Sequence, residues 1–332
     1  MSCLDHGSWF SKIEPDCMCR WQDLCSVICP RVILNVDDLV HLSHMPALTQ
    51  LEFVPSDSFP ASHPLLVFPN LHDLTLRCES SSLISRLLFR TRLLAITNFE
   101  VNILECPSKQ ELTSLLASVQ VSCAAHTIQS LRLICYPPLP RSVDGREGRL
   151  LDLEYLRPCM AFSDLRCLTL DMEWNVDLSD SEVLALGSAW PKLEKLLINE
   201  HWGWNSEGGI TPGGLLGLWE TCRSLNEIAV SFDTRGYTQV YVYPSEALRN
   251  PELGPPPHLS IHVLDSAIEE ESVDAIIEFF CNNATRWKSG LSLCVWDLQT
   301  RSTMEYWEYA RWDDISRQVN SVFRIRSECG LG

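Results

Sequence analysis

One short apolar pattern recurs along the chain and restricts its fold more than any other feature. The pattern is apolar, two variable residues, apolar, one variable residue, apolar, as in LTQLEF, LHDLTL and LEKLLI. The alternation at the end of each copy predicts a short strand, because successive side chains of a strand point to opposite faces. The central apolar residues of the copies are Leu51, Leu74, Phe99, Leu131, Leu168, Leu196, Ile228, Ile261 and Leu293. Successive copies are therefore about 23 to 37 residues apart, the length of a strand plus a helix.

Helix-start signals lie between these strands. Ser108 with Glu111 and Ser179 with Glu182 have the spacing of capping boxes, and Thr211 precedes Pro212. A repeated strand and helix with this leucine pattern predicts an α/β leucine-rich-repeat solenoid with irregular repeats. We expect a curved parallel sheet on the concave side and helices on the convex side. A doubly wound α/β domain is the alternative, but one strand motif rarely recurs so often there, and no Gly-rich nucleotide loop opens the chain.

The chain ends are expected to cap the solenoid. We assign residues 1–30 to an N-terminal helical or irregular cap, 31–299 to the repeats and 300–332 to a C-terminal capping helix. In the N-terminal cap, RWQDLCSVICP is interpreted as an amphipathic helix. Its inward residues would be Leu24, Cys25, Ile28 and Cys29. The C-terminal helix is predicted around residues 313–324, where Ile315, Val319, Val322 and Phe323 have helical spacing.

Charge and composition exclude several classes of function. The net charge of −17 argues against nucleic acid, which needs a basic surface. No apolar run is long enough to span a membrane, and no signal peptide is recognised, so a cytoplasmic or nuclear protein is expected. The 15 cysteines are then expected to be reduced. Five of them lie within the first 29 residues, but their spacing fits no familiar zinc module, so no metal site is predicted.

Motifs for catalysis were tested and fail. The window GGITPGGL, residues 208–215, has the glycines of a phosphate-binding loop but lacks its lysine and serine. The motifs G-x-G-x-x-G, H-E-x-x-H and G-x-S-x-G are absent. We therefore expect no enzyme, no catalytic residues and no cofactor. An enzyme with a site in the loop between Tyr136 and Arg149 is the alternative, although its prolines, glycines and charges favour a flexible insertion.

Three stretches resemble the leucine-rich-repeat region of fungal F-box proteins. They are FPNLHDLTLRC, FSDLRCLTLDMEWNVDLSDSEVLALGSAWPKLEKLLINEHWGWN and GGITPGGLLGLWETCRSLNEIAVSFDTRGY. The resemblance covers roughly residues 25–300 and is most specific between about 160 and 240. In that family the repeats recruit a protein substrate, and an F-box binds the Skp adaptor of a cullin–RING ubiquitin ligase.

The resemblance implies a non-enzymatic protein-interaction module, like the substrate-recognition part of an F-box ubiquitin-ligase adaptor. The leucine–proline–x–glutamate start of an F-box is not present. A Skp-type adaptor is therefore expected as a partner only if an F-box lies upstream. A repeat scaffold unrelated to ubiquitination is the rival interpretation. In either case the partner is expected to be a protein and the chain a monomer.

The repeats also depart from the family pattern at one position. An asparagine is expected three residues after the last apolar residue of each strand. The residues found there are Glu79, Leu104, Tyr136, Glu173, His201 and Asp233. We therefore do not expect an asparagine ladder to hold these turns together.

Two surfaces are candidates for binding a partner. The first is the concave face, formed by the residues that alternate with the apolar ones along each strand. Its charged and polar members are Arg77, Glu100, Arg132, Thr169, Asp171, Lys195, Asn199 and Glu227.

The second surface is a rim of loops that follow three consecutive strands. We call it the loop rim. Aromatic residues together with arginine are typical of interface hot spots, although the tryptophans could instead pack beneath the loops. Its members are Glu173, Trp174, Glu200, His201, Trp202, Trp204, Asp233, Arg235 and Tyr237.

Overall fold

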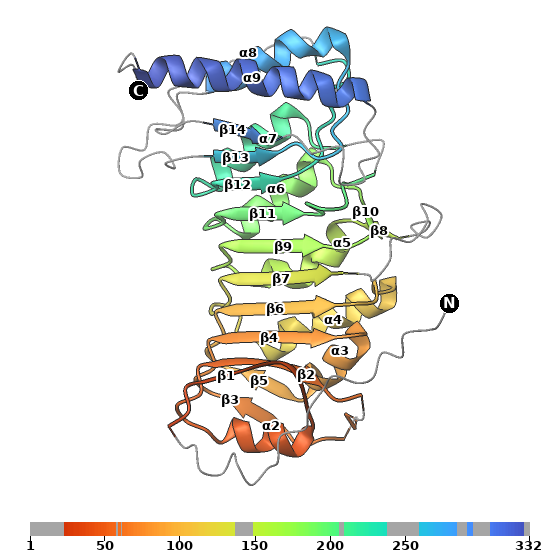
Figure 1. Ribbon diagram of the computed structural model, residues 1–332, viewed down its shortest axis with the longest axis vertical. Coiled ribbons are helices and arrows are strands. Elements are labelled where there is room, and N and C mark those ends of the chain that lie inside the picture. The colour runs from red at the N-terminus through yellow and green to blue at the C-terminus, as the bar shows by residue number, and fades with distance from the viewer. Residues whose placement is uncertain are drawn as a thin grey trace, which may run out of the picture. The chain divides into compact units, whose positions relative to one another are not determined.

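The computed structural model (Figure 1) describes residues 23–57, 59–60, 62–136, 149–205, 209–237, 259–283, 291–294 and 306–328. The described side chains of the last of these segments are those of residues 310–322. The chain divides into two compact units, residues 1–140 and 141–332, and each is described by itself. The predicted cap residues 1–22 and the loop residues 137–148 lie outside the described residues.

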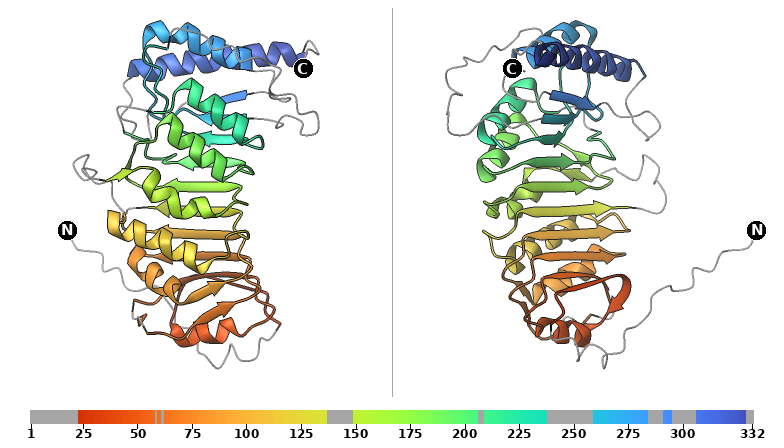
Figure 2. Two further views of the ribbon diagram at one scale, coloured as in Figure 1. Left: turned by 180° about the vertical axis from the view of Figure 1, so that it is seen from behind. Right: turned by 60° about the vertical axis from the view of Figure 1, so that its left-hand side comes forward.

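In the first unit, a parallel sheet has the strand order β1-β2-β4-β6-β7. The strands are β1 (Ser26–Leu34), β2 (Gln50–Pro55), β4 (Asp73–Cys78), β6 (Asn98–Ile103) and β7 (Ser130–Cys135). The helices are α2 (Val36–Ser43), α3 (Ser81–Phe89) and α4 (Lys109–Ser122). A smaller parallel pair consists of β3 (Leu66–Phe68) and β5 (Thr91–Leu93). Helices α3 and α4 lie on one side of β4, β6 and β7, and the other side of these strands is open (Figures 1 and 2).

The second unit repeats this arrangement, with the strand order β9-β11-β12-β13-β14. The strands are β9 (Cys167–Asp171), β11 (Lys195–Ile198), β12 (Glu227–Ala229), β13 (Leu259–His262) and β14 (Leu291–Cys294). A short pair, β8 (Leu150–Leu151) and β10 (Asn175–Val176), lies beside them. The helices are α5 (Leu153–Leu156), η2 (Arg157–Ala161), α6 (Asp180–Ala189), α7 (Pro212–Thr221), η3 (Glu270–Ser272), α8 (Val273–Asn283) and α9 (Tyr306–Glu328).

The recurring apolar residues occupy equivalent positions in the two sheets. In the first unit, Leu51, Leu74, Phe99 and Leu131 are successive register partners. In the second unit, Leu168 begins a row that continues through Leu196, Ile228, Ile261 and Leu293. Each of these side chains is at most 4% exposed. The periodicity in the sequence therefore corresponds to one continuous apolar row inside each unit.

A backbone motif recurs at the start of six of the described strands, β2, β4, β6, β7, β11 and β12. The carbonyl of Thr49 accepts the N–H groups of both His72 and Asp73, at 2.8 and 3.0 Å. In the second unit, the carbonyl of Arg166 likewise accepts the N–H groups of Glu194 and Lys195. The same pairing recurs at Cys25, His72, Thr97 and Glu194. These bonds set the register of each strand against the preceding one and depend on no particular side chain.

The helix starts predicted from the sequence are confirmed. The Ser108 N–H donates to the carboxylate of Glu111 at 2.8 Å, and the Ser179 N–H donates to Glu182 at the same distance. Thr211 caps α7 by accepting the N–H of Gly214, and Pro212 is the first helical residue. These contacts satisfy N–H groups that have no partner within the first turn of a helix.

The predicted N-terminal amphipathic helix is wrong. Residues 26–34 form β1, which pairs in parallel with β2. Four of its nine residues are valine or isoleucine, which favour a strand, and Pro30 would remove a hydrogen bond from a helix interior. The register shifts between Ile28 and Ile33, around this proline. As a result Ile28 is 55% exposed and Cys25 is exposed, instead of both facing inward.

The helix α9 is longer than the predicted range of 313–324 and covers the last strand of the second unit. Its residues Trp312, Ile315 and Val319 are fully buried. The Trp312 indole donates to the carbonyl of Ser266 at 2.9 Å, and the Ser316 hydroxyl donates to the carbonyl of Leu293 at 2.8 Å. The apolar face of β14 is therefore shielded. None of the helices within the described ranges is long and apolar enough to cross a membrane.

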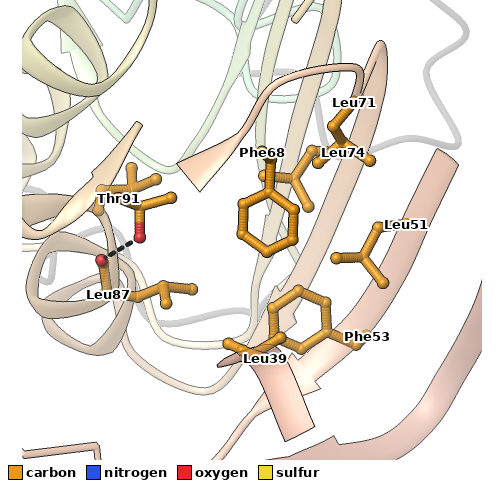
Figure 3. A pocket seen from close by; sticks show the side chains of 9 residues that line it. Leu39, Leu51, Phe53, Phe68, Leu71, Leu74, Leu87 and Thr91 are labelled. Carbon is orange, nitrogen blue, oxygen red and sulfur yellow. Dashed lines mark hydrogen bonds between the residues drawn. The ribbon is translucent and has the colours of Figure 1, made fainter. Parts of the chain in front are cut away.

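The core of the first unit contains a small apolar cavity of about 10 Å³, between β2, β4, β3 and the helices α2 and α3 (Figure 3). The hydroxyl of Thr91 faces it but donates to the carbonyl of Leu87 at 2.7 Å. The rest of the lining is leucine and phenylalanine. A space near the size of one water molecule, without available polar groups, is a packing gap and not a binding site.

The register row makes a prediction about stability. Leu131→Ala removes a fully buried side chain from the row and should lower the free energy of unfolding by about 2–5 kcal/mol. Leu94→Ala is the matched control, because Leu94 is 52% exposed and its truncation should cost about 1 kcal/mol or less. Urea denaturation of both variants measures the difference. Equal losses would show that Leu131 does not belong to the core.

Candidate functional site

The open face of the first sheet carries polar side chains that pair between neighbouring strands. Arg77 on β4 donates to Glu52 on β2 at 2.7 Å. Arg132 on β7 lies 3.2 Å from Glu100 on β6. The predicted concave-face residues Arg77, Glu100 and Arg132 therefore do lie on the face opposite the helices. Such partly exposed pairs contribute little to stability, which leaves them available for contact with a partner.

The open face of the second sheet carries a longer charged row. Lys195 on β11 contacts Glu227 on β12, with 2.5 Å between Nζ and Oε2. The His262 Nε2 lies 3.7 Å from Glu227, and its Nδ1 lies 3.4 Å from Glu200. Leu197 is half-buried in the adjacent register row, between Thr169 and Ala229. An apolar side chain thus lies beside acidic, basic and histidine groups. We call Lys195, Leu197, Glu200, Glu227 and His262 the charged row.

Three predicted concave-face residues of the second unit are buried instead. Thr169 and Asp171 are 6% and 3% exposed, and Asn199 is fully buried. Strand alternation fails at Asn199 because it lies beyond the end of β11, at a positive φ of 54° that turns the backbone. Asp171 is covered by the loop that follows this turn.

The side chain of Asn199 joins two successive loops. Its Oδ1 accepts the N–H of Met172 at 3.1 Å, and its Nδ2 donates to the carbonyls of Trp174 and Gly203. This is a single asparagine and not a ladder repeated along the turns, so it does not contradict the expectation from the sequence. The asparagine stands one residue after the strand, two positions before the place where the family pattern has it.

The loop rim does not form as one exposed surface. Trp174 and Trp204 are fully buried, and Glu173 is 1% exposed. The Trp204 indole donates to the carbonyl of Ile198 at 3.0 Å. Trp174 packs edge-on against Tyr155, with 5.5 Å between the ring centroids. The two tryptophans therefore pack beneath the loops, and none of the three side chains is available at the surface.

Asp265 holds the buried part of the loop rim in place. Its carboxylate accepts the N–H of Trp204 at 2.9 Å and the N–H of Asn205 at 2.6 Å. Gly203 precedes them with a φ of +70°, and a Cβ there would lie 2.7 Å from Asp265 Oδ2. The glycine is therefore required both by the turn and by the close approach of the carboxylate.

His201 is the most exposed predicted rim residue with a defined charged partner. Its Nδ1 lies 2.7 Å from Asp171 Oδ2, and its backbone N–H donates to Asp171 Oδ1 at 3.1 Å. Its side chain is 69% exposed. The hydrogen bond with Asp171 raises the pKa of His201 above its ordinary value. Burial opposes this shift, and the charges of Asp171 and Glu200 add to it.

The remaining rim residues are partly exposed. The Arg235 guanidinium donates from Nε to Asp233 Oδ1 at 2.9 Å and from Nη2 to Asp233 Oδ2 at 3.1 Å. Both side chains remain accessible to solvent. Tyr237 packs edge-on against Phe279. Glu200, Trp202 and Tyr237 are half-buried. The exposed portion of the loop rim therefore consists mainly of charged and polar groups, with Trp202 partly exposed among them.

In the part of the chain that the structure describes, no group of three histidines, cysteines, aspartates or glutamates is placed to hold a metal ion. Of the N-terminal cysteines, Cys25 and Cys29 are described: Cys25 is exposed and Cys29 lies on β1. Cys3, Cys17 and Cys19 lie outside the described residues.

Two functional residues were missed by the sequence analysis. His262 contacts both Glu200 and Glu227, and Asp265 anchors a loop some 60 residues earlier in the chain. His262 could have been found, since it alternates with Ile261 and Val263 in a recognised copy of the strand pattern. Asp265 carries no sequence signal, because its partners are backbone N–H groups.

No known protein-family model matches the chain, and no curated protein matches it.

Asn199 provides a test of how the loops are joined. Asn199→Ala removes buried hydrogen bonds. It also puts alanine at a positive φ, a backbone angle that asparagine tolerates better than alanine. The free energy of unfolding should therefore fall by about 2–4 kcal/mol. Asn199→Gly loses the same bonds but tolerates the backbone angle, and should be less destabilising by about 1 kcal/mol. Chemical denaturation compares the two. Indistinguishable wild-type and alanine proteins would contradict the role of Asn199.

His201 predicts a dependence of stability on pH. The pKa of His201 in the folded protein is raised above the ordinary value of about 6.5. Its contribution to the free energy of unfolding is therefore fully present below that pH, and it is lost as the pH rises through the folded-state pKa. His201→Gln should therefore destabilise the protein more at about pH 6 than at about pH 8.5. Thermal unfolding at both pH values measures this. The exposed His126 is the control, and an equal pH dependence for His126→Gln would contradict the assignment to His201.

Proposed function

We propose that the chain is a leucine-rich-repeat protein that binds a partner protein on the open face of its second sheet. The charged row is the observation that carries this proposal. It lies opposite the helices, it combines both signs of charge with the half-buried Leu197, and its groups come from four different strands and loops. Protein interfaces commonly have an apolar centre with a polar surround.

The composition of this face favours a protein over other ligands. Lys195 is balanced by Glu227, and Glu200 adds a further negative charge next to His262. Nucleic acid would require a surplus of positive charge, which this face does not have. A small-molecule site would require a concave pocket with a mainly apolar lining. The charged row instead offers a broad, rigid surface on strands, suited to complementary side chains of a folded or extended protein segment.

The resemblance to the repeats of F-box proteins suggests a cellular role for this binding surface. In this interpretation the chain recruits a substrate for ubiquitination and acts in the cytoplasm or nucleus. The rival is a repeat scaffold that holds a partner without any link to ubiquitin. The regular register of Leu168, Leu196 and Ile228 supports the repeat architecture that both interpretations share.

The proposal predicts that one outward substitution on the sheet abolishes partner binding. Leu197→Glu places an additional carboxylate beside Glu200 and Glu227, so binding should weaken by at least about tenfold while the fold is retained. Leu184→Glu, on helix α6, is the matched control because Leu184 is 37% exposed. The partner is identified by affinity purification of the tagged full chain with quantitative mass spectrometry, and its affinity for the purified variants is then measured by titration calorimetry.

Two outcomes separate the interpretations. If both variants retain the partner, the charged row is not the binding surface. Co-purification of a Skp-type adaptor and a cullin with the wild type would favour the ubiquitin-ligase interpretation. A partner that is lost in Leu197→Glu but never accompanied by these proteins would favour the scaffold. Circular dichroism and thermal unfolding verify that each variant is folded.

A further inference from the structure

The helix side of the first unit has a cluster of exposed apolar side chains. Phe89 is 69% exposed, Val121 is 60% and Leu65 is 54%. Leu94 and Val67, also exposed, belong to the same region. Single exposed apolar residues are ordinary, but a contiguous group marks an interaction surface. We call the following residues the apolar–arginine patch: Leu65, Val67, Phe89, Leu94, Val121, Arg86, Arg90 and Arg92.

Backbone contacts bring these residues together from separate segments. The N–H of Leu66 donates to the carbonyl of Arg90 at 2.9 Å, and the N–H of Leu94 donates to the carbonyl of Phe68 at 3.2 Å. Val67 and Arg92 are direct register partners on β3 and β5. The Ser122 hydroxyl donates to the carbonyl of Leu88, which places Val121 near Phe89. The patch therefore extends over β3, β5 and the ends of α3 and α4, on the side of the sheet where the helices lie (Figure 2).

The charge of the patch is opposite to that of the whole chain. The segments 59–72, 80–99 and 112–130 contain no aspartate or glutamate, although the chain has 43 acidic residues and a net charge of −17. Among the described residues, Arg86, Arg90 and Arg92 form no ion pair with a carboxylate, whereas Arg77 and Arg132 on the other face are paired. The Arg92 guanidinium has one internal contact, to the carbonyl of Thr91. Within the described parts of the chain no carboxylate neutralises these three guanidinium groups, which suits them to an acidic partner.

The edge of the small sheet is protected against strand addition. Pro64 and Pro69 flank β3 on both sides, and proline has no N–H to donate to an added strand. A partner would therefore be recognised through side chains and not by extension of the sheet.

We propose that the apolar–arginine patch binds an acidic, amphipathic segment of a partner protein. The apolar side chains of that segment would cover Phe89, Leu94 and Val121, while its carboxylates pair with Arg86, Arg90 and Arg92. Bidentate pairing with carboxylates is the contact for which the guanidinium is best shaped. An anionic membrane is disfavoured as the occupant, because a chain with a net charge of −17 is repelled by such a surface. This surface is separate from the charged row, so the proposal does not depend on the function proposed above.

The test uses the full chain and a random library of peptides about 16 residues long, displayed on phage. The double variant Phe89→Ser with Arg90→Glu changes the patch. Its matched control, Leu104→Ser with Arg223→Glu, makes the same changes at exposed positions outside the patch. We expect peptides enriched on wild type over the patch variant to combine Asp or Glu with Leu or Phe. The tightest of them, synthesised with a fluorescent label, should bind the patch variant at least about tenfold more weakly in an anisotropy titration. The control variant should bind it like wild type, and salt should weaken the binding.

Each other outcome overturns the proposal. Enriched peptides that lack acidic residues, or bind wild type and the patch variant equally, exclude an acidic segment at this surface. Failure to enrich any patch-dependent peptide excludes it as well. Co-sedimentation with vesicles of four parts phosphatidylcholine to one part phosphatidylserine, lost in the patch variant, would assign the patch to a membrane. A dimer in light scattering that the patch variant abolishes would assign it to a second copy of the chain. Circular dichroism verifies that the variants are folded.

Discussion

Alignment of one apolar residue from each strand with its counterpart on the next is the constraint on which the rest of the structure depends. Rows such as Leu168, Leu196 and Ile228 bury their side chains against the helices only if the register is kept. A shift by one residue would turn every polar side chain inward. The repeated pairing of two N–H groups with one carbonyl, at the starts of six strands, keeps that register. Because this pairing involves only the backbone, the spacing between repeats can vary while the sheets remain regular.

Once the apolar rows are buried, alternating residues such as Lys195 and Glu227 are left to solvent, and the proposed binding surface lies there. Lys195, Glu227 and His262 come from three strands that are far apart in the sequence, yet they meet because their strands share one register. The apolar–arginine patch has a different origin. It lies where the secondary pair β3 and β5 leaves Val67 and its neighbours uncovered. The first unit thus carries an apolar and arginine-rich surface, and the second unit carries the charged row.

The strands and most helix starts could be predicted from the sequence because they depend on local patterns. Leucine spacing located Leu196, and a serine with a following glutamate located the start of α6. Prediction failed where tertiary contacts override the local pattern. The pairing of β1 with β2 decides the conformation of residues 26–34. The sequence located the tryptophans of the loop rim in the loops that follow the strands, but it did not reveal that Trp174 and Trp204 are buried. Their loops are held by Asn199 and Asp265, and no spacing in the sequence indicates those contacts.

The contact between Asp265 and the loop at Trp204 also has a consequence for how the chain is made. The carboxylate lies 61 residues after the tryptophan whose N–H it accepts. During synthesis from the amino end, the strand β11 can therefore join its neighbour β9 before this acceptor has left the ribosome. The loop gains its final anchor only later, when β13 has been added. An intermediate stalled before residue 265 would leave the backbone N–H groups of Trp204 and Asn205 without their carboxylate acceptor.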